Sequence, residues 1–434
     1  MKKIKFLIYF PLILLLLINH QITNPSKITV KANGSNSKEF GWHLHKIHAI
    51  DAWKITNGSS DISIAVIDSG INFSHPELTH AQWINKGEDP DGNNGLDDDN
   101  NGYTDDRWGW DFVSQDKIPG PEPSDPIHRH ATFIAGIIAA SINNEGIAGI
   151  ASNVTIMDLR VLKDDNYAGT TNEGLGESIR YAVDNGADII SMSLQYYPNS
   201  TVYYDDIQYA VANDVPIVSI TGNTWLASGG GKYYQSFPGG YNEVISVGAT
   251  NYTDHKADYS NYGEWTELVA PVGDQMYDTL DHLIKSTHLN GKSYANSYGT
   301  SYACPQVSAT IALMKSINSE VSYNEIREIL HATATDLGIA GKDDYFGYGM
   351  LNVTGALEEL IDKTTTVSTS TSSTASTNTS TSSTASTNIS TSSTASTNSI
   401  TSRNGIGGYP TTITLFCISL LIVSDRIRKY KKRK

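Results

Sequence analysis

The sequence predicts an α/β fold in which helices cover both faces of a doubly wound, mostly parallel β-sheet. Two observations predict it. Short apolar runs rich in β-branched residues have the length of buried strands, and they alternate with longer segments that have the 3.6-residue period of amphipathic helices. This alternation is typical of strand–helix–strand units, whose parallel strands are buried on both faces.

The first expected strand covers residues 62–67 and delivers Asp68 at its carboxyl end. Parallel sheets bind ligands outside the carboxyl ends of their strands, where the strand order reverses, so polar residues at those ends should meet there. The further expected strands are 154–162, 188–194, 215–220 and 244–249, and the expected helices are 130–142, 173–185 and 203–213.

Both ends of the chain have the composition of membrane-targeting segments. In residues 1–25, three lysines precede an apolar run, which is the order found in a signal peptide or an N-terminal anchor. Residues 405–424 are largely apolar and have about the length of a transmembrane helix, and the basic tail 425–434 marks the cytoplasmic side. We therefore expect an exported, single-pass protein of the cell membrane whose main domain is extracellular.

The segment before the expected membrane helix has almost no apolar residues. Residues 363–404 are nearly all Ser, Thr, Ala and Asn, with TSSTASTN repeated, so we expect a disordered, solvated stalk. A short N-terminal segment, 26–39, and one globular domain, 40–362, remain.

Composition limits the classes of partner and cofactor. The two cysteines, Cys304 and Cys417, lie far apart and give no disulfide framework. The net charge of −15 argues against a nucleic-acid partner and favours solubility or bound cations. We expect no organic cofactor, and nothing in the sequence sets the oligomeric state.

Four polar residues have the positions that amide hydrolysis requires. Asp68 and Asn223 end strands, while His130 in HATFIAGIIA and Ser301 in GTSYACPQVSA open helices. The reaction needs a nucleophile, a base, a group that holds the base, and donors for the oxyanion. Each residue alone could be a helix cap or a turn residue. Four such caps would not be expected to form one enzyme's pattern.

These segments resemble those of the subtilisin-like serine proteases over roughly residues 40–360. The resemblance implies a subtilisin-like fold, with Ser301 as nucleophile, His130 as general base and then acid, and Asp68 as the carboxylate that orients the imidazole. It also implies that the Asn223 side chain and the Ser301 N–H bind the oxyanion. Further matching segments are NNEGIAGIA, SMSL at 191–194, SNYG at 260–263 and GYGMLN at 347–352.

The resemblance implies protein or peptide substrates that bind as an added strand. The residues expected to bind substrate belong to the walls of a side-chain pocket at 193–195, 219–222 and 236–239, and they are Ser193, Leu194, Gln195, Thr221 and Gly222.

Four positions depart from the pattern of the family. Ala131 and Gln195 stand where glycine is usual, Tyr302 where methionine is usual, and Gln306 where histidine is usual. None of them is a catalytic group. Ala131 could displace His130 slightly, and Gln195 could narrow the substrate pocket.

An acidic insert, 86–112, lies between Asp68 and His130. Within it, Asp97, Asp99, Asn101 and Asp105 have the alternating oxygen-ligand spacing of a calcium loop, although Trp108 replaces the last EF-hand ligand. We expect a structural Ca²⁺ at these four residues. The alternative is a solvated acidic loop rich in turn residues.

Two other functions fit parts of the sequence. A catalytically impaired surface binding protein or adhesin would also use the stalk, the anchor and the acidic loop. A serine-carboxyl peptidase of the same fold would use a glutamate base, and the histidine motif argues against that class.

Overall fold

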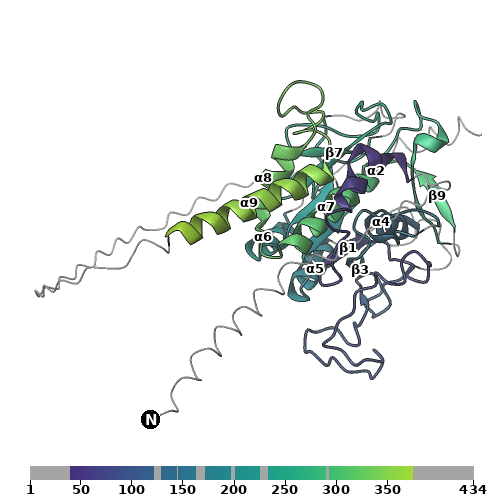
Figure 1. Ribbon diagram of the computed structural model, residues 1–434. Helices are drawn as coiled ribbons and strands as arrows, with labels where there is room; N and C mark the ends of the chain where they lie inside the picture. Colours follow the sequence, from purple (N-terminus) through teal and green to yellow (C-terminus); the bar gives the residue numbers. More distant parts are fainter. Residues whose placement is uncertain are drawn as a thin grey trace, which may run out of the picture. The chain divides into compact units, whose positions relative to one another are not determined.

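The computed structural model describes residues 40–121, 129–143, 145–162, 172–196, 201–224, 233–289 and 293–374 (Figure 1). The expected signal segment, most of the stalk, the expected membrane helix and the basic tail lie outside these residues. Across the described ranges, we find no helix that combines the length and the apolar character needed to cross a bilayer.

A seven-stranded parallel sheet forms the centre of the domain, in the order β2-β3-β1-β4-β5-β6-β7. The chain places β3 and β2 on one side of β1 and the later strands on the other, so the strand order reverses beside β1. The strands are β1 (Ser63–Asp68), β2 (Gly109–Asp111), β3 (Thr155–Arg160), β4 (Ile189–Met192), β5 (Ile217–Ile220), β6 (Ile245–Thr250) and β7 (Leu268–Pro271).

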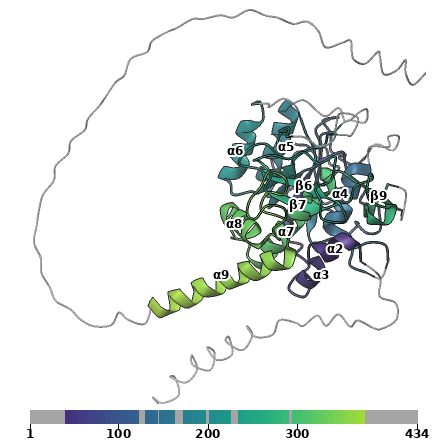
Figure 2. The same cartoon turned by 90° about the horizontal axis from the view of Figure 1, so that it is seen from above.

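Helices cover both faces of this sheet, as the sequence predicts. Successive side chains of a strand point to opposite faces, and in β1 Ile64 and Val66 belong to one apolar core while Ala65 and Ile67 belong to the other. The larger core contains residues of α2 (Trp42–Lys46), α3 (Ala49–Ala52), α4 (Arg129–Ala139), α7 (Cys304–Ile317), α8 (Tyr323–Thr333) and α9 (Val353–Thr374). The other core contains residues of α5 (Asn172–Asp184) and α6 (Tyr204–Ala212), and Figure 2 shows these two helices across the strands from α2 and α3.

All five strands and all three helices expected from the sequence are present, with ends that differ by a few residues. The helices α2, α3, α8 and α9 were not among the expected elements, and neither were β2, β7 and the antiparallel hairpin of β8 (Ile284–Thr287) and β9 (Tyr294–Ser297). This hairpin packs on α4, where the Ser286 hydroxyl donates to the Phe133 carbonyl at 2.7 Å.

Helix α9 differs from the expected boundary between domain and stalk. It continues through Thr374, so the first residues of the expected stalk are helical. Ala356, Leu357 and Leu360 are buried against the larger core and fix the first turns of the helix. Each further residue then adds a hydrogen bond to a helix already formed, so little extra stabilisation is needed to extend it.

Candidate active site

Asp68 and His130 form a buried pair at the carboxyl edge of the sheet. His130 Nδ1 lies 2.8 Å from Asp68 Oδ1 and 3.0 Å from Oδ2. Asp68 is 1% exposed and His130 is 8% exposed. An ionised carboxylate only accepts hydrogen bonds, so Nδ1 must carry the proton of the neutral ring. The lone pair is then on Nε2, which can act as a base.

Local contacts hold this pair in place. The Ser69 N–H donates to Asp68 Oδ1 at 2.8 Å, and the Ser69 hydroxyl accepts from the Ala131 N–H at 3.2 Å. The second bond joins the first turn of α4 directly to the end of β1. Ala131 is fully buried in this arrangement, and His130 still reaches Asp68.

Ser301 lies in the short 3-10 helix η4 (Thr300–Tyr302), which leads into α7 and packs on α4. Its hydroxyl donates to the Ser193 carbonyl at 3.4 Å, and the Ser193 hydroxyl donates to the Ser301 carbonyl at 2.8 Å. A distance of 3.4 Å is long for an O–H···O bond, so this contact restrains the Ser301 hydroxyl only weakly. The ring centroid of Tyr302 lies 5.6 Å from that of His130, which brings the residue after Ser301 next to the imidazole.

The side chain of Asn223 is fixed to the residue that precedes Ser301. Its Oδ1 accepts from the Thr300 N–H at 2.9 Å and from the Thr300 hydroxyl at 3.0 Å. Because Oδ1 is engaged in this way, Nδ2 is the end of the amide that can donate to a bound carbonyl oxygen.

The residues expected to bind substrate lie on two loops that follow adjacent strands. Ser193, Leu194 and Gln195 follow β4, and Thr221 and Gly222 follow β5. The Gln195 side chain contacts the second loop, because its Oε1 accepts from the Asn223 N–H at 2.6 Å. The structure therefore brings the two expected sets together at one edge of the sheet.

Two other departures from the family pattern have structural partners. Tyr302 packs between His130 and Phe133, whose ring centroid is 4.4 Å away. Gln306 is fully buried, and its Nε2 donates to the carbonyls of Pro271 and Tyr302, both at 2.9 Å. Cys304, in the same turn, is also fully buried, and burial raises the pKa of its thiol to about 11. That thiol therefore has no nucleophilic character at neutral pH.

The acidic insert gathers carboxylates in a set that differs in part from the expected one. Within the described ranges, one oxygen each from Glu88, Asp99 and Asp106 lie within 4.8 Å of one another. Ca²⁺ holds its oxygens at about 2.3–2.6 Å, so oxygens on opposite sides of the ion stand up to about 5 Å apart. The cluster therefore has the spacing for one such ion.

Two of the three carboxylates, Glu88 and Asp106, are buried and Asp99 is exposed, so burial makes part of this cluster electrostatically costly without a cation. Glu88 is 3% exposed, and its Oε2 has no hydrogen-bond partner among the described residues. Burial is the main cause that raises the pKa of Glu88, and the carboxylates of Asp106, Asp99 and Asp98 add to it. Burial also raises the pKa of Asp106, although Tyr181, Asn101 and Asn85 donate to its carboxylate.

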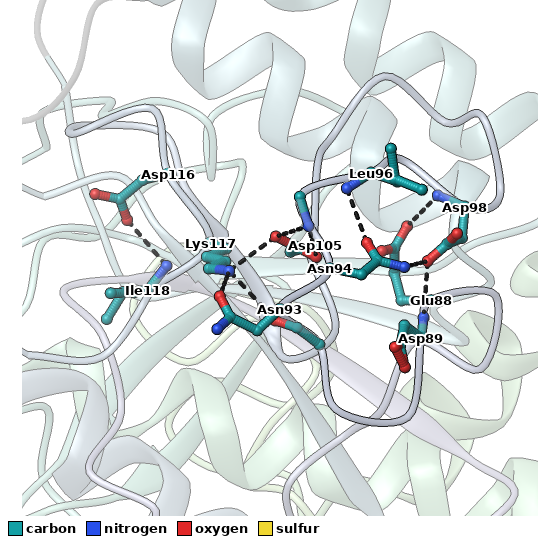
Figure 3. A network of polar contacts seen from close by, with 12 residues as sticks. Glu88, Asp89, Asn93, Asn94, Leu96, Asp98, Asp105, Asp116, Lys117 and Ile118 are labelled. Carbon is teal, nitrogen blue, oxygen red and sulfur yellow. Dashed lines mark hydrogen bonds and ion pairs between the residues drawn. The ribbon is translucent and has the colours of Figure 1, made fainter.

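The other expected calcium ligands have different partners. Asp97 accepts from the backbone N–H groups of Asn101, at 3.1 Å, and Gly102, at 2.9 Å. Asp105 forms a 2.8 Å ion pair with Lys117, which Figure 3 shows beside Asn93. Asn101 lies next to the cluster, but its Nδ2 donates to Asp106 at 2.9 Å.

Three residues of these sites were not expected from the sequence. Thr300 holds the Asn223 side chain, and Glu88 and Asp106 complete the carboxylate cluster. The sequence Gly-Thr-Ser places a second hydroxyl directly before Ser301, and this could have indicated a role for Thr300. Loop spacing gave no signal for Glu88, which precedes Asp99 by eleven residues and reaches it only through the folded loop.

Comparisons with known proteins agree with this geometry. Residues 59–349 match the sequence model of the subtilase family. A thermophilic serine proteinase of Bacillus sp. (strain AK1) is 35% identical over 302 residues, which are 69% of this chain and 63% of the relative. The minor extracellular protease Epr of Bacillus subtilis (strain 168) is 32% identical over 310 residues, 71% of this chain and 40% of Epr.

Thermitase of Thermoactinomyces vulgaris is similar over almost its whole length. It is 30% identical over 324 residues, which are 74% of this chain and 97% of thermitase. The chain thus spans less than two thirds of the first two relatives and nearly all of the third.

Proposed function

Since this chain belongs to the subtilase family, we propose that it is a serine endopeptidase that hydrolyses peptide bonds through an acyl-enzyme intermediate. The observation that carries the proposal is the buried pair of Asp68 and His130, with the serine of η4 packed beside α4. A carboxylate that fixes the imidazole tautomer is what a serine nucleophile requires of its base.

Each residue of the triad has a defined step. The Ser301 hydroxyl attacks the peptide carbonyl while His130 Nε2 takes its proton, and the imidazolium then protonates the leaving amine. Asp68 keeps the proton on Nδ1 and stabilises the imidazolium. Water repeats the sequence on the acyl-enzyme and releases the acid product. The weak bond from Ser301 to the Ser193 carbonyl supports this role, since the hydroxyl can turn toward another acceptor.

The oxyanion that forms during attack needs donors held in place beforehand. Asn223 Nδ2 and the Ser301 N–H supply them in this proposal. The two bonds from Thr300 to Asn223 Oδ1 support it, because they fix the amide plane relative to the residue next to the nucleophile.

A structural calcium ion is part of the proposal. Glu88, Asp99 and Asp106 would hold it, with Asn101 close enough to add its side-chain oxygen if the amide turns over. The buried Glu88 oxygen without a partner among the described residues supports this assignment. A bound Ca²⁺ supplies positive charge to a partly buried group of carboxylates, and therefore stabilises the insert rather than the reaction.

The proposed location is the outer cell surface. The basic and apolar segments at both ends of the sequence support an exported domain with a single membrane anchor. Its substrates would be extracellular proteins or peptides, bound as an added strand beside Ser193 and Leu194.

One experiment tests activity and location together. Intact cells that express the chain are treated with a membrane-impermeant fluorophosphonate probe, and casein cleavage by the exported domain is measured in parallel. We expect labelling and cleavage by the wild-type protein and neither by a Ser301→Ala variant. Equal casein cleavage by both proteins would remove Ser301 from its role. A wild-type protein that neither cleaves nor labels would instead indicate a surface binding protein.

A further inference from the structure

The side chain of Gln195 joins the two loops that flank the candidate nucleophile. Residues 193–196 follow β4, residues 221–224 follow β5, and these strands are neighbours in the sheet. Gln195 Oε1 accepts from the Asn223 N–H at 2.6 Å, and its Nε2 donates to the Asn223 carbonyl at 3.4 Å. The amide thus spans from one loop to the other and pairs with both backbone groups of Asn223.

The space beside this amide is already filled. Gly222 has a φ of +99°, and a Cβ at that position would lie 2.5 Å from Ser236 Oγ and 2.9 Å from Gln195 Oε1. Ser236 is fully buried, and its hydroxyl donates to the Thr221 carbonyl at 2.8 Å. A third segment, which contains Ser236, therefore also packs against the second loop beside Gly222.

The same region lies next to the atoms of the reaction. Ser301 Oγ is 3.4 Å from the Ser193 carbonyl, and Asn223 is bound to Thr300. A carbonyl attacked by Ser301 and held by Asn223 must sit between the ends of these two loops. This carbonyl belongs to the substrate residue on the acyl side of the scissile bond. The side chain of that residue then extends into the space between the two loops, which the Gln195 side chain spans.

We infer that Gln195 limits the residue on the acyl side of the scissile bond to a small side chain, such as glycine, alanine or serine. This inference rests on the proposed peptidase function. A large side chain must displace Gln195, which leaves the Asn223 N–H without its acceptor. Asn223 is also the oxyanion donor, so the displacement disturbs transition-state binding, and large residues lose kcat as well as affinity.

The test is a series of otherwise identical peptide amides that carry Gly, Ala, Leu or Phe at the acyl position. With the full-length protein, we expect kcat/KM for Ala to exceed that for Phe by at least about tenfold. In Gln195→Gly, the ratio of Phe to Ala should rise by at least about tenfold, because the amide no longer occupies the pocket. In Gln195→Glu, which keeps the length of the side chain, the preference for Ala should remain.

Gln115→Gly is the matched control. Gln115 is exposed beside β2 and has a φ of +57°, a conformation that glycine adopts readily. It should leave the Phe to Ala ratio unchanged.

The failure of this inference is distinct from the failure of the peptidase function. If the wild-type protein cleaves the Phe peptide as fast as the Ala peptide, Gln195 does not restrict the pocket, although the enzyme is active. An unchanged ratio in a folded Gln195→Gly variant leads to the same conclusion. If the wild-type protein cleaves no peptide and Ser301 takes up no fluorophosphonate, both the function and the inference are wrong.

Discussion

His130 Nδ1 lies within 3.0 Å of both carboxylate oxygens of Asp68, and the two side chains are buried together. The two residues are 62 positions apart in the sequence. The pair meets because β1 ends at Asp68 and the first turn of α4 is bonded to Ser69. The contacts at the carboxyl end of β1 thus set the orientation of the imidazole before any substrate binds.

Replacement of Asp68 by asparagine tests this orientation. The Asn side-chain oxygen can still accept from the Ser69 N–H, but its NH₂ group would face Nδ1 and favour the wrong tautomer. We expect kcat on a peptide substrate to fall by about 10⁴-fold with KM almost unchanged. Steady-state kinetics and a melting curve measure the two effects separately.

Asp158→Asn is the control for that variant. Burial raises the pKa of Asp158 well above its usual range and so favours its neutral form, and its Oδ2 accepts from the Ile71 N–H at 2.8 Å. The amide can keep this bond and most of the activity should remain. Similar rates for Asp68→Asn and Asp158→Asn would contradict the role given to Asp68.

Removal of calcium should destabilise the wild-type protein. Loss of an ion present at about 100 times its Kd removes about 2.7 kcal/mol, which lowers Tm by roughly 4 °C in a domain of this size. Scanning calorimetry with and without EDTA measures the change.

Two variants identify the ligands. Glu88→Gln should melt early and show no further response to EDTA. Asp105→Asn should still respond, because its partner is Lys117. A wild-type Tm that is unaffected by excess EDTA would show that the acidic loop holds no stabilising ion.

His43 should make the protein sensitive to mild acid. The ring is buried and its Nδ1 has no partner among the described residues, and burial lowers its pKa from 6.5 to about 3. Between these values the unfolded chain binds a proton that the folded protein excludes, so stability falls as the pH drops below 6.5. The loss contributed by this residue at pH 5 is about 2 kcal/mol.

His43→Leu should therefore reduce the loss in the free energy of unfolding at pH 5 by about that amount. His45→Gln, at an exposed position of the same helix, should keep most of the wild-type pH dependence. Urea unfolding at pH 5 and pH 8 measures the difference. Parallel pH profiles for wild type and His43→Leu would exclude His43 as the source.

Gln306 should contribute to stability through two buried bonds. Gln306→Met removes the donor from the carbonyls of Pro271 and Tyr302 and should cost about 2–4 kcal/mol. Gln306→His keeps a ring N–H and should recover part of that loss. Urea unfolding of the three proteins is the measurement, and a Met variant as stable as wild type would refute the role of these bonds.

The sequence by itself determined the α/β class, five strands of the main sheet, the helices between them and the residues proposed for catalysis. These features are local: a buried strand such as 62–67 is a continuous apolar run, and a reactive residue stands at the end of its own element. The short strand β2 escaped prediction because its three residues, Gly-Trp-Asp, form no apolar run. β7 lies at the edge of the sheet and ends at Pro271, and a proline within a short apolar run weakens the prediction of a strand from sequence.

Only the tertiary structure decided which distant groups meet. It assigned Glu88 and Asp106, rather than Asp97 and Asp105, to the carboxylate cluster, and it brought the Gln195 amide onto Asn223. Both results depend on how loops close over a folded sheet, and that closure is set by packing and burial over long separations in the chain. Residue spacing within one segment does not contain this information.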